Sequence, residues 1–344
     1  RNGEELFIGL DPFGINSNFD NRLNISGPVI KDKVYFFSNF RAQDINGHLN
    51  GIQRFQVWNL SDFYDQDTSN WTSENTGDGS YVPMGTGDYK TYMGKLSFNM
   101  GNIKYSLMRN VNSGQSQGYS HIYKYNPDGR SYQDTKTTLD MFQLNHFLNE
   151  KMFYDIRISR TNNYYGSYVF KDFDSYRVMD EDGIYQGVYH FKGDTVYNYV
   201  HDKYMTAYGV GFFTGGQEKG HTQRRTITTN SKFDFTWQIN NSHSLKTGFS
   251  RTLYDLDNKY RSIRNKYEGT ALDSDVYEPV VYGDSTVYSD IYRVKPRETS
   301  IYIQDKFERD EIVINFGIRY DQFDANTTYP SQRRNPTNSS TYYL

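Results

Sequence analysis

The clearest pattern in this sequence is an alternation of apolar and polar side chains over short stretches. Between residues 232 and 239, the apolar and aromatic residues Phe233, Phe235, Trp237 and Ile239 alternate with Lys232, Asp234, Thr236 and Gln238. Successive side chains of a β-strand point to opposite faces, so this pattern predicts a strand with one apolar and one polar face.

Strands of this kind come in pairs that are separated by two or three residues. The pairs are Lys90–Met100 with Ile103–Val111, Thr138–Leu148 with Met152–Tyr164, Thr226–Ile239 with His243–Asp255, and Thr299–Glu308 with Ile312–Asp321. Two or three residues are enough for a hairpin turn. We therefore predict four antiparallel hairpins.

Much longer polar connections separate one hairpin from the next. The longest runs over residues 166–223 and contains a further alternating segment, Ile184–Phe191, which predicts either an extension of the sheet strands or a small extra hairpin. Short turns at one end of the strands and long loops at the other are typical of outer-membrane β-barrels. Predicted strands of ten to thirteen residues are also long enough to cross an apolar band of about 25 Å when tilted. The alternative is an antiparallel sheet with one face buried under another protein layer.

The N-terminal region adds one more strand pair. Asp20–Ser26 and Val34–Gln43 alternate, and a turn is expected in the GPVIKDK segment between them. We expect residues 1–19 to be an irregular lead-in and 20–344 to form one β domain with about twelve strands. No stretch predicts a helix of three turns.

Composition is compatible with this interpretation. The mean hydropathy of the 344 residues is −0.84, and no run approaches the roughly 18 apolar residues of a membrane helix. The 33 tyrosines and 23 phenylalanines suit the aromatic girdles of a membrane barrel. The absence of cysteine argues against a disulfide-stapled secreted scaffold.

Charge is concentrated in the long connections. The net charge is −3, which gives no electrostatic signature for nucleic acid binding. The segment from Asp44 to Asp88 has seven acids and one base, and the segment from Asp273 to Asp290 has five acids and no base. Such clusters indicate a solvated loop surface, with cation binding by pairs such as Asp273 and Asp275 as the alternative.

No arrangement of residues predicts catalysis, a cofactor or a metal centre. Gly114–Gly118 matches the G-x-S-x-G pattern, but no helix is predicted after it, as a nucleophile elbow requires. The seven histidines are scattered without the spacing of metal ligands. We therefore expect a protein that is not an enzyme.

Aromatic residues of the connections are the candidate ligand-binding residues. Rings interleaved with Asp and Asn are suited to hold sugars, peptides or chelates by stacking and hydrogen bonding. The candidates are Trp58, Trp71, Tyr81, Tyr277, Tyr282 and Tyr288. The alternative is that these rings only pack the connections against each other.

Three segments resemble a known family. Asn21–Phe40, His243–Ser250 and Thr299–Asp324 are similar to barrel strands of TonB-dependent outer-membrane receptors, particularly Oar-like and Bacteroidetes-type members. The matching residues are Gly27, Pro28, Lys31, Asp32 and Lys33 in the first segment and Tyr302, Gln304, Asp305, Gly317, Arg319, Tyr320 and Asp321 in the last. These would have structural roles in the barrel.

The resemblance implies an internal fragment of a 22-stranded transmembrane barrel from the outer membrane of a Gram-negative bacterium. Such a receptor imports a scarce ligand, and its partners are the membrane lipid, the TonB–ExbB–ExbD complex and, in some members, a surface lipoprotein. TonB would act through an N-terminal plug region that precedes this segment. The ligand would be a glycan, a peptide or a metal chelate.

Two other functions fit the same pattern. One is a complete small outer-membrane barrel, acting as a pore or a barrel enzyme. The other is a soluble extracellular β-protein that binds carbohydrate.

Overall fold

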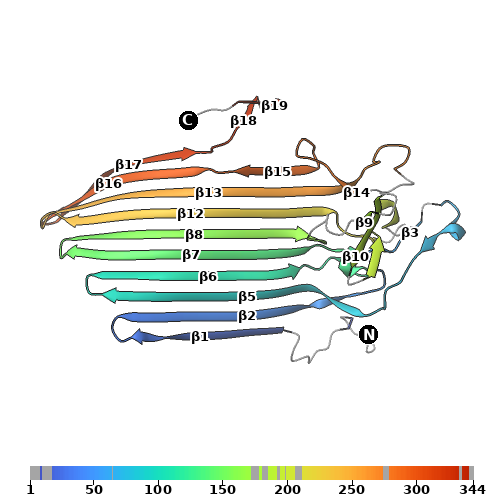
Figure 1. The fold of residues 1–344 in the computed structure, drawn as a ribbon, viewed down its shortest axis with the longest axis horizontal. Helices are drawn as coiled ribbons and strands as arrows, with labels where there is room; N and C mark the ends of the chain where they lie inside the picture. The colour runs from blue at the N-terminus through green and yellow to red at the C-terminus, as the bar shows by residue number, and fades with distance from the viewer. Residues whose placement is uncertain are drawn as a thin grey trace.

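The protein is an all-β molecule dominated by one broad antiparallel sheet (Figure 1). The computed structural model describes residues 8–9, 18–63, 65–171, 178–179, 185–191, 194–197, 199–205, 211–273, 279–332 and 335–340. The sheet has twelve strands in the described residues. Ten of them are the strands predicted from the alternation, and the other two, in the segment 279–294, were not predicted.

Ten strands follow each other across the sheet in the order of the sequence. They are β1 (Asn18–Ile30), β2 (Val34–Ile52), β5 (Tyr81–Met100), β6 (Ile103–Gln117), β7 (Tyr132–Asn149), β8 (Met152–Tyr168), β12 (Gly220–Gln238), β13 (His243–Asn265), β16 (Arg297–Arg309) and β17 (Ile312–Asp324). All neighbours are antiparallel. The short turns lie at one end of the sheet and the long connections at the other, as predicted (Figure 1).

Smaller elements lie in the long connections or extend the sheet. β14 (Pro279–Val281) and β15 (Ser289–Val294) both pair with the end of β13. Separate small sheets are formed by β9 (Val178–Met179), β10 (Tyr185–Phe191) and β11 (Asp194–Tyr197), by β3 (Ser61–Asp62) and β4 (Thr72–Ser73), and by β18 (Tyr329–Gln332) and β19 (Asn335–Ser340). The 3-10 helices are η1 (Thr68–Asn70), η2 (His121–Tyr123), η3 (Pro127–Gly129) and η4 (Asp202–Tyr204). Of the two alternatives predicted for Ile184–Phe191, the small hairpin is present: β10 pairs with β11, and also with β9, in a sheet separate from the main one.

Register divides the sheet into two chemically different faces. One row of directly paired residues crosses all ten strands and is apolar or aromatic throughout: Ile30, Val34, Phe98, Tyr105, Leu144, Ile156, Phe233, Phe249, Ile301 and Tyr320. We call the side of the sheet that carries this row the apolar face. Its side chains are exposed in the described molecule, with Ile318 77% and Tyr320 61% exposed.

The residue next to each member of the apolar row points to the opposite side of the sheet, which we call the polar face. Its adjacent row consists of Tyr35, Ser97, Ser106, Gln143, Arg157, Lys232, Ser250, Ser300 and Asp321. Apolar side chains do occur on this face, among them Phe37, Met108 and Met141 in a neighbouring row. At the level of these two rows, the predicted alternation holds from β2 to β17.

Several strands are longer than the alternation predicts. β13 was expected to end at Asp255 but continues to Asn265, where β14 and β15 replace β16 as its partner. Polar residues can continue a strand when backbone pairing continues, so the hydrophobic pattern underestimates these ends.

The first turn is tighter than predicted. Gly27 and Pro28 belong to β1, and the reversal uses Lys31, Asp32 and Lys33. Asp32 adopts a left-handed backbone conformation with φ 60°, and the Lys33 N–H donates to the Ile30 carbonyl at 3.1 Å. A proline is tolerated in β1 because this strand is at the edge of the sheet.

A packed core is found at the end of the sheet that carries the long connections. All ten buried hydrophobic residues of the described chain lie there: Phe55, Val57, Met84, Tyr123, Tyr168, Phe170, Tyr199, Val200, Met205 and Ile263. We call this region the loop end and the remaining strands the wall. The wall has two open edges, since β1 pairs only with β2 and β17 only with β16 in the described residues.

No helix in the described ranges is long and apolar enough to cross a membrane.

Candidate functional site in the polar face

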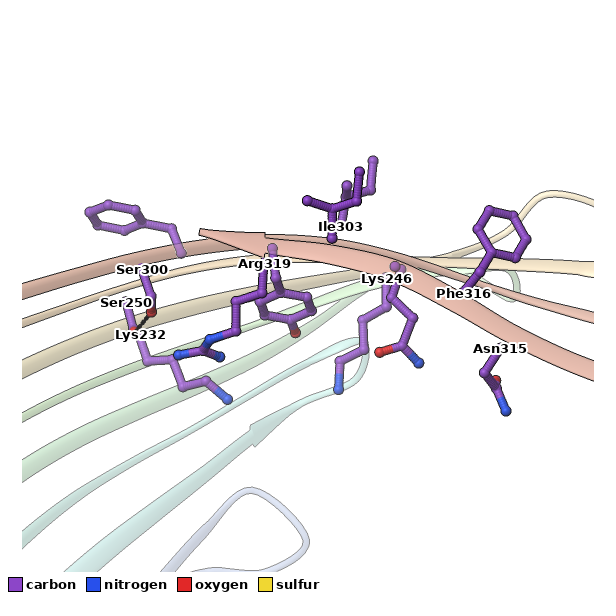
Figure 2. A pocket seen from close by; sticks show the side chains of 13 residues that line it. Lys232, Lys246, Ser250, Ser300, Ile303, Asn315, Phe316 and Arg319 are labelled. Atoms are coloured by element: carbon purple, nitrogen blue, oxygen red, sulfur yellow. Dashed lines mark hydrogen bonds between the residues drawn. The ribbon is translucent and has the colours of Figure 1, made fainter. Parts of the chain in front are cut away.

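A hollow of about 560 Å³ lies against the polar face, where β12, β13, β16 and β17 adjoin. Its polar lining residues are Lys232, Lys246, Ser250, Ser300, Tyr302, Gln304, Asn315 and Arg319. Figure 2 shows Lys232, Lys246, Asn315 and Arg319 on one side of the strands, with Ile303 and Phe316 on the other. Strand alternation is thus the reason that side chains from four strands converge here.

A carboxylate held by two partners lies beside the hollow. The Tyr302 hydroxyl donates to Oδ1 of Asp234 at 2.5 Å, and the Lys232 ammonium lies 2.8 Å from Oδ2. The Asp234 side chain is only 13% exposed, so these contacts offset most of the cost of removing its charge from water.

Two glycines make room for this arrangement. A Cβ atom on Gly248 would overlap the Tyr302 ring, which covers the glycine from the neighbouring strand. A Cβ atom on Gly317 would lie 2.8 Å from the Ile303 carbonyl oxygen and 3.1 Å from Cα of Gln304. Both positions therefore need a residue without a side chain.

Positive charge exceeds negative charge around the hollow. Arg319 forms an ion pair of 2.8 Å with Asp321, and Lys232 pairs with Asp234. Lys246 has no carboxylate within ion-pair distance in the described part of the chain. The Lys246 ammonium interacts electrostatically with Asp155 and Asp234 without an ion pair to either, and its N–H groups can donate to an anionic or acceptor-rich group.

Residues of the family resemblance divide between this hollow and other places. Tyr302, Gln304, Gly317 and Arg319 line the hollow together, and Asp321 is the ion-pair partner of Arg319. Tyr320 belongs to the apolar row. Far from the hollow, Gly27 and Pro28 lie in β1, and Lys31, Asp32 and Lys33 form the first turn.

Asp305 has a different environment from its neighbours in the motif. It lies on the apolar face, where its side chain is 12% exposed and pairs with Nδ1 of His243 at 2.7 Å. This pair links β13 to β16 near the short turns. The pair neutralises a carboxylate at a largely apolar level of this face.

The candidate aromatic residues of the connections do not form one surface. Trp58 packs against the core cluster of Phe170, Tyr199 and Ile263. Trp71 donates its indole N–H to the Asp65 carbonyl at 2.9 Å and meets the Phe63 ring edge-on at 5.5 Å. Both tryptophans thus stabilise the connections.

The tyrosines are placed differently. Tyr282 and Tyr288 form a pair with ring centroids 5.6 Å apart, and the Arg264 guanidinium lies 4.7 Å from the Tyr288 centroid. Tyr81 is 56% exposed at the start of β5. Tyr277 lies outside the described residues. Ligand binding by these residues stays a prediction.

Sequence reasoning did not find the hollow, because Lys246, Tyr302 and Gly317 are far apart in the chain. One signal was present: Tyr302 is an aromatic residue at a polar-face position, between Ile301 and Ile303 of the apolar face. No group of three or more His, Cys, Asp or Glu residues suited to a metal ion occurs in the described ranges.

No protein-family model matches the sequence, and no curated protein matches it significantly. The chain is similar in structure to the outer membrane transporter YddB from Escherichia coli, with 10% identity and a TM-score of 0.51 over 89% of this chain and 34% of that one. It is also similar to FpvA of P. aeruginosa in complex with a pyoverdine and iron, with 12% identity and a TM-score of 0.50 over 89% of this chain and 35% of that one.

The chain spans about a third of the length of these two proteins. At such low identity the likeness concerns the fold. It shows that the sheet has the fold of a strand wall from TonB-dependent outer-membrane receptors, as the sequence resemblance implies.

Proposed function

We propose that this chain is part of the barrel of a TonB-dependent receptor in the outer membrane of a Gram-negative bacterium. The apolar face contacts lipid, the polar face lines the interior, and the long connections face the outside. The observation that carries this proposal is the unbroken apolar row across ten strands, next to a polar row one residue away.

The proposed activity is the import of a scarce ligand, energised by the TonB–ExbB–ExbD complex through a plug region. The cationic hollow around Lys246 and Arg319 favours a ligand with anionic groups, such as a metal chelate or an acidic glycan or peptide. FpvA in complex with a pyoverdine and iron has a related fold, which supports a chelate as one of these classes. The proposed role requires no catalysis.

The proposal is tested with two adjacent residues of β13. Phe249 and Ser250 lie at the same depth but on opposite faces. In the intact protein that carries this segment, Phe249→Arg should destabilise insertion by about 2–4 kcal/mol, because the charge would enter the lipid near mid-membrane. Ser250→Arg places the same side chain on the watery side and should assemble normally.

Folding into lipid vesicles, followed by resistance to protease and by urea titration, measures the difference. Equal behaviour of the two variants would contradict the assignment of the faces. If Ser250→Arg assembles defectively and Phe249→Arg assembles normally, the assignment of the two faces is reversed.

A further inference from the structure

A cluster of basic residues lies on the apolar face beyond the apolar row, towards the loop end. We call it the basic cluster; it consists of Arg109 of β6, Lys136 of β7, Arg160 of β8, Arg225 of β12 and Lys259 of β13. Each is an even number of residues from the apolar row on its own strand, and pairing is continuous in between. The cluster therefore lies on the same face as the apolar row.

Carboxylates neutralise only part of this cluster. Arg109 lies 3.6 Å from Asp140, and Lys259 lies 3.9 Å from Asp257. Within the described ranges, Lys136, Arg160 and Arg225 have no carboxylate at ion-pair distance.

The five cations of the cluster, together with Arg224, which also lines this area, and the two acids Asp140 and Asp257 sum to a charge of +4, whereas the whole chain carries −3. Arg225 also donates from Nε to the Asn162 amide oxygen at 3.1 Å, which orients its guanidinium over the face. The cluster is thus a local exception to the acidity of the chain.

The basic cluster is continuous with an apolar area of the same face. The cluster surrounds a depression of about 580 Å³. A second depression of about 670 Å³ shares Arg109, Asp140 and Arg160 with it. The second one extends to apolar residues of the face, including Leu96, Leu107, Phe142 and Ile158. One continuous surface is therefore cationic towards the loop end and apolar towards the short turns.

We propose that this surface binds a phosphorylated membrane lipid, with the phosphate on the basic cluster and the acyl chains on the apolar depression. This inference rests on the proposed function, in which the apolar face contacts lipid. Guanidinium groups bind phosphate oxygens through paired hydrogen bonds, and basic residues at a membrane surface attract anionic headgroups. Free phosphate or an acidic protein segment would use the cations but leave the apolar depression unfilled.

The experiment compares two lipids that differ in the phosphate alone. The intact protein in detergent is titrated with phosphatidic acid and with diacylglycerol of the same chain length, and native mass spectrometry counts the bound lipid. Phosphatidic acid should bind at least tenfold more tightly than diacylglycerol. Replacing Lys136, Arg160 and Arg225 by Gln together should lower the affinity for phosphatidic acid at least tenfold. Each single replacement should lower it about fivefold.

A matched control removes the same charge from the other face. Lys95, Lys104 and Arg157 lie on the polar face, and their replacement by Gln should leave phosphatidic acid binding unchanged. Inorganic phosphate alone should compete poorly, because it cannot use the apolar depression.

Three results would overturn the inference: equal binding of the two lipids, unchanged binding in all cluster variants, or full competition by inorganic phosphate. These results are distinct from failure of the proposed function. That failure would appear as equal assembly of Phe249→Arg and Ser250→Arg, whatever the lipid binding.

Discussion

The loop end and the wall are built on opposite principles. At the loop end, connections from distant parts of the chain meet around a core such as Phe170, Tyr199 and Ile263, each less than 8% exposed. In the wall, large apolar residues such as Ile318 and Tyr320 stay exposed. The buried hydrophobic residues that belong to long strands of the described chain, Met84, Tyr168 and Ile263, lie at the strand ends that join the loop end. The loop end can satisfy its apolar groups by itself in water, whereas the wall needs an apolar environment from outside.

The two regions also use polar groups differently. At the loop end, Asn59 is completely buried, and its amide oxygen accepts from the backbone N–H groups of Gln56 and Thr76. In the wall, polar side chains such as Ser250 and Ser300 pair across strands on one face, with oxygens 2.6 Å apart. The first arrangement fixes the shape of a connection, and the second only lines a surface.

The largest expected effect is a loss of stability at the loop end when its core is truncated. Phe170→Ala should cost about 3–5 kcal/mol in the free energy of unfolding of the loop end, because it leaves a cavity between Tyr199 and Ile263. Hydrogen exchange should show lost protection at residues 199–205 and 262–265, while residues 226–238 of the wall keep theirs.

The control is Ile318→Ala, which truncates an exposed residue of the wall and should leave exchange at the loop end unchanged. If Phe170→Ala also exposes residues 226–238, the two regions unfold as one unit and the comparison fails.

A smaller effect concerns the polar face of the wall. Tyr302→Phe removes the hydroxyl that donates to Asp234 and leaves this carboxylate with Lys232 alone. Because hydrogen bonds to charged groups are stronger than neutral ones, the wall should lose about 1.5–3 kcal/mol of stability. Thermal unfolding of the intact protein in detergent measures the loss.

Tyr320→Phe is the matched control, since this residue lies on the apolar face of β17 and is 61% exposed. It should unfold as the unchanged protein does. A loss of stability as large as that of Tyr302→Phe would show that the hydrogen bond to Asp234 is not the cause.

The smallest effect depends on pH and is confined to the loop end. The backbone N–H of Gly269 and the side-chain amide of Asn265 donate to Asp273, which holds the pKa of its carboxyl below the ordinary value. A depressed carboxyl pKa stabilises the folded state above the unfolded pKa, and this contribution is lost as the pH falls through the folded pKa. The protection factor of the Gly269 amide, the exchange rate of an unstructured peptide at the same pH divided by its own, should therefore fall below about pH 4.

Asp273→Asn should remove this pH dependence, since the amide does not titrate. The wall around residues 226–238 should show no matching change. An Asp273→Asn variant that still responds to acid would assign the effect to another group.

Alternation along the chain was enough to predict the wall. Lys232 and Phe233 were placed on opposite faces, and the short turns on one end, because both depend on neighbours in the sequence. The contact of Tyr302 with Asp234 could not be predicted in this way, since it joins residues 68 positions apart and depends on the register of two intervening pairings.

The core of the loop end could not be predicted from the sequence, for a different reason. Trp58, Phe170, Tyr199 and Ile263 come from four separate segments without any common periodicity. Their meeting depends on the packing of irregular backbone, for which a single sequence has no simple signal. Strand ends such as Leu256–Asn265 of β13 were missed because most of their residues are polar, without alternation, and the strand continues through backbone pairing.

The unbroken row from Ile30 to Tyr320 also limits how such a sequence can change length. Removing a single residue from the middle of β12 would turn every side chain beyond it to the wrong side, whereas removing two would restore the original sides. Insertions and deletions within the strands are thus expected to be tolerated only in even numbers. The connections at the loop end are not limited to even-numbered changes, and their lengths are expected to differ freely between relatives.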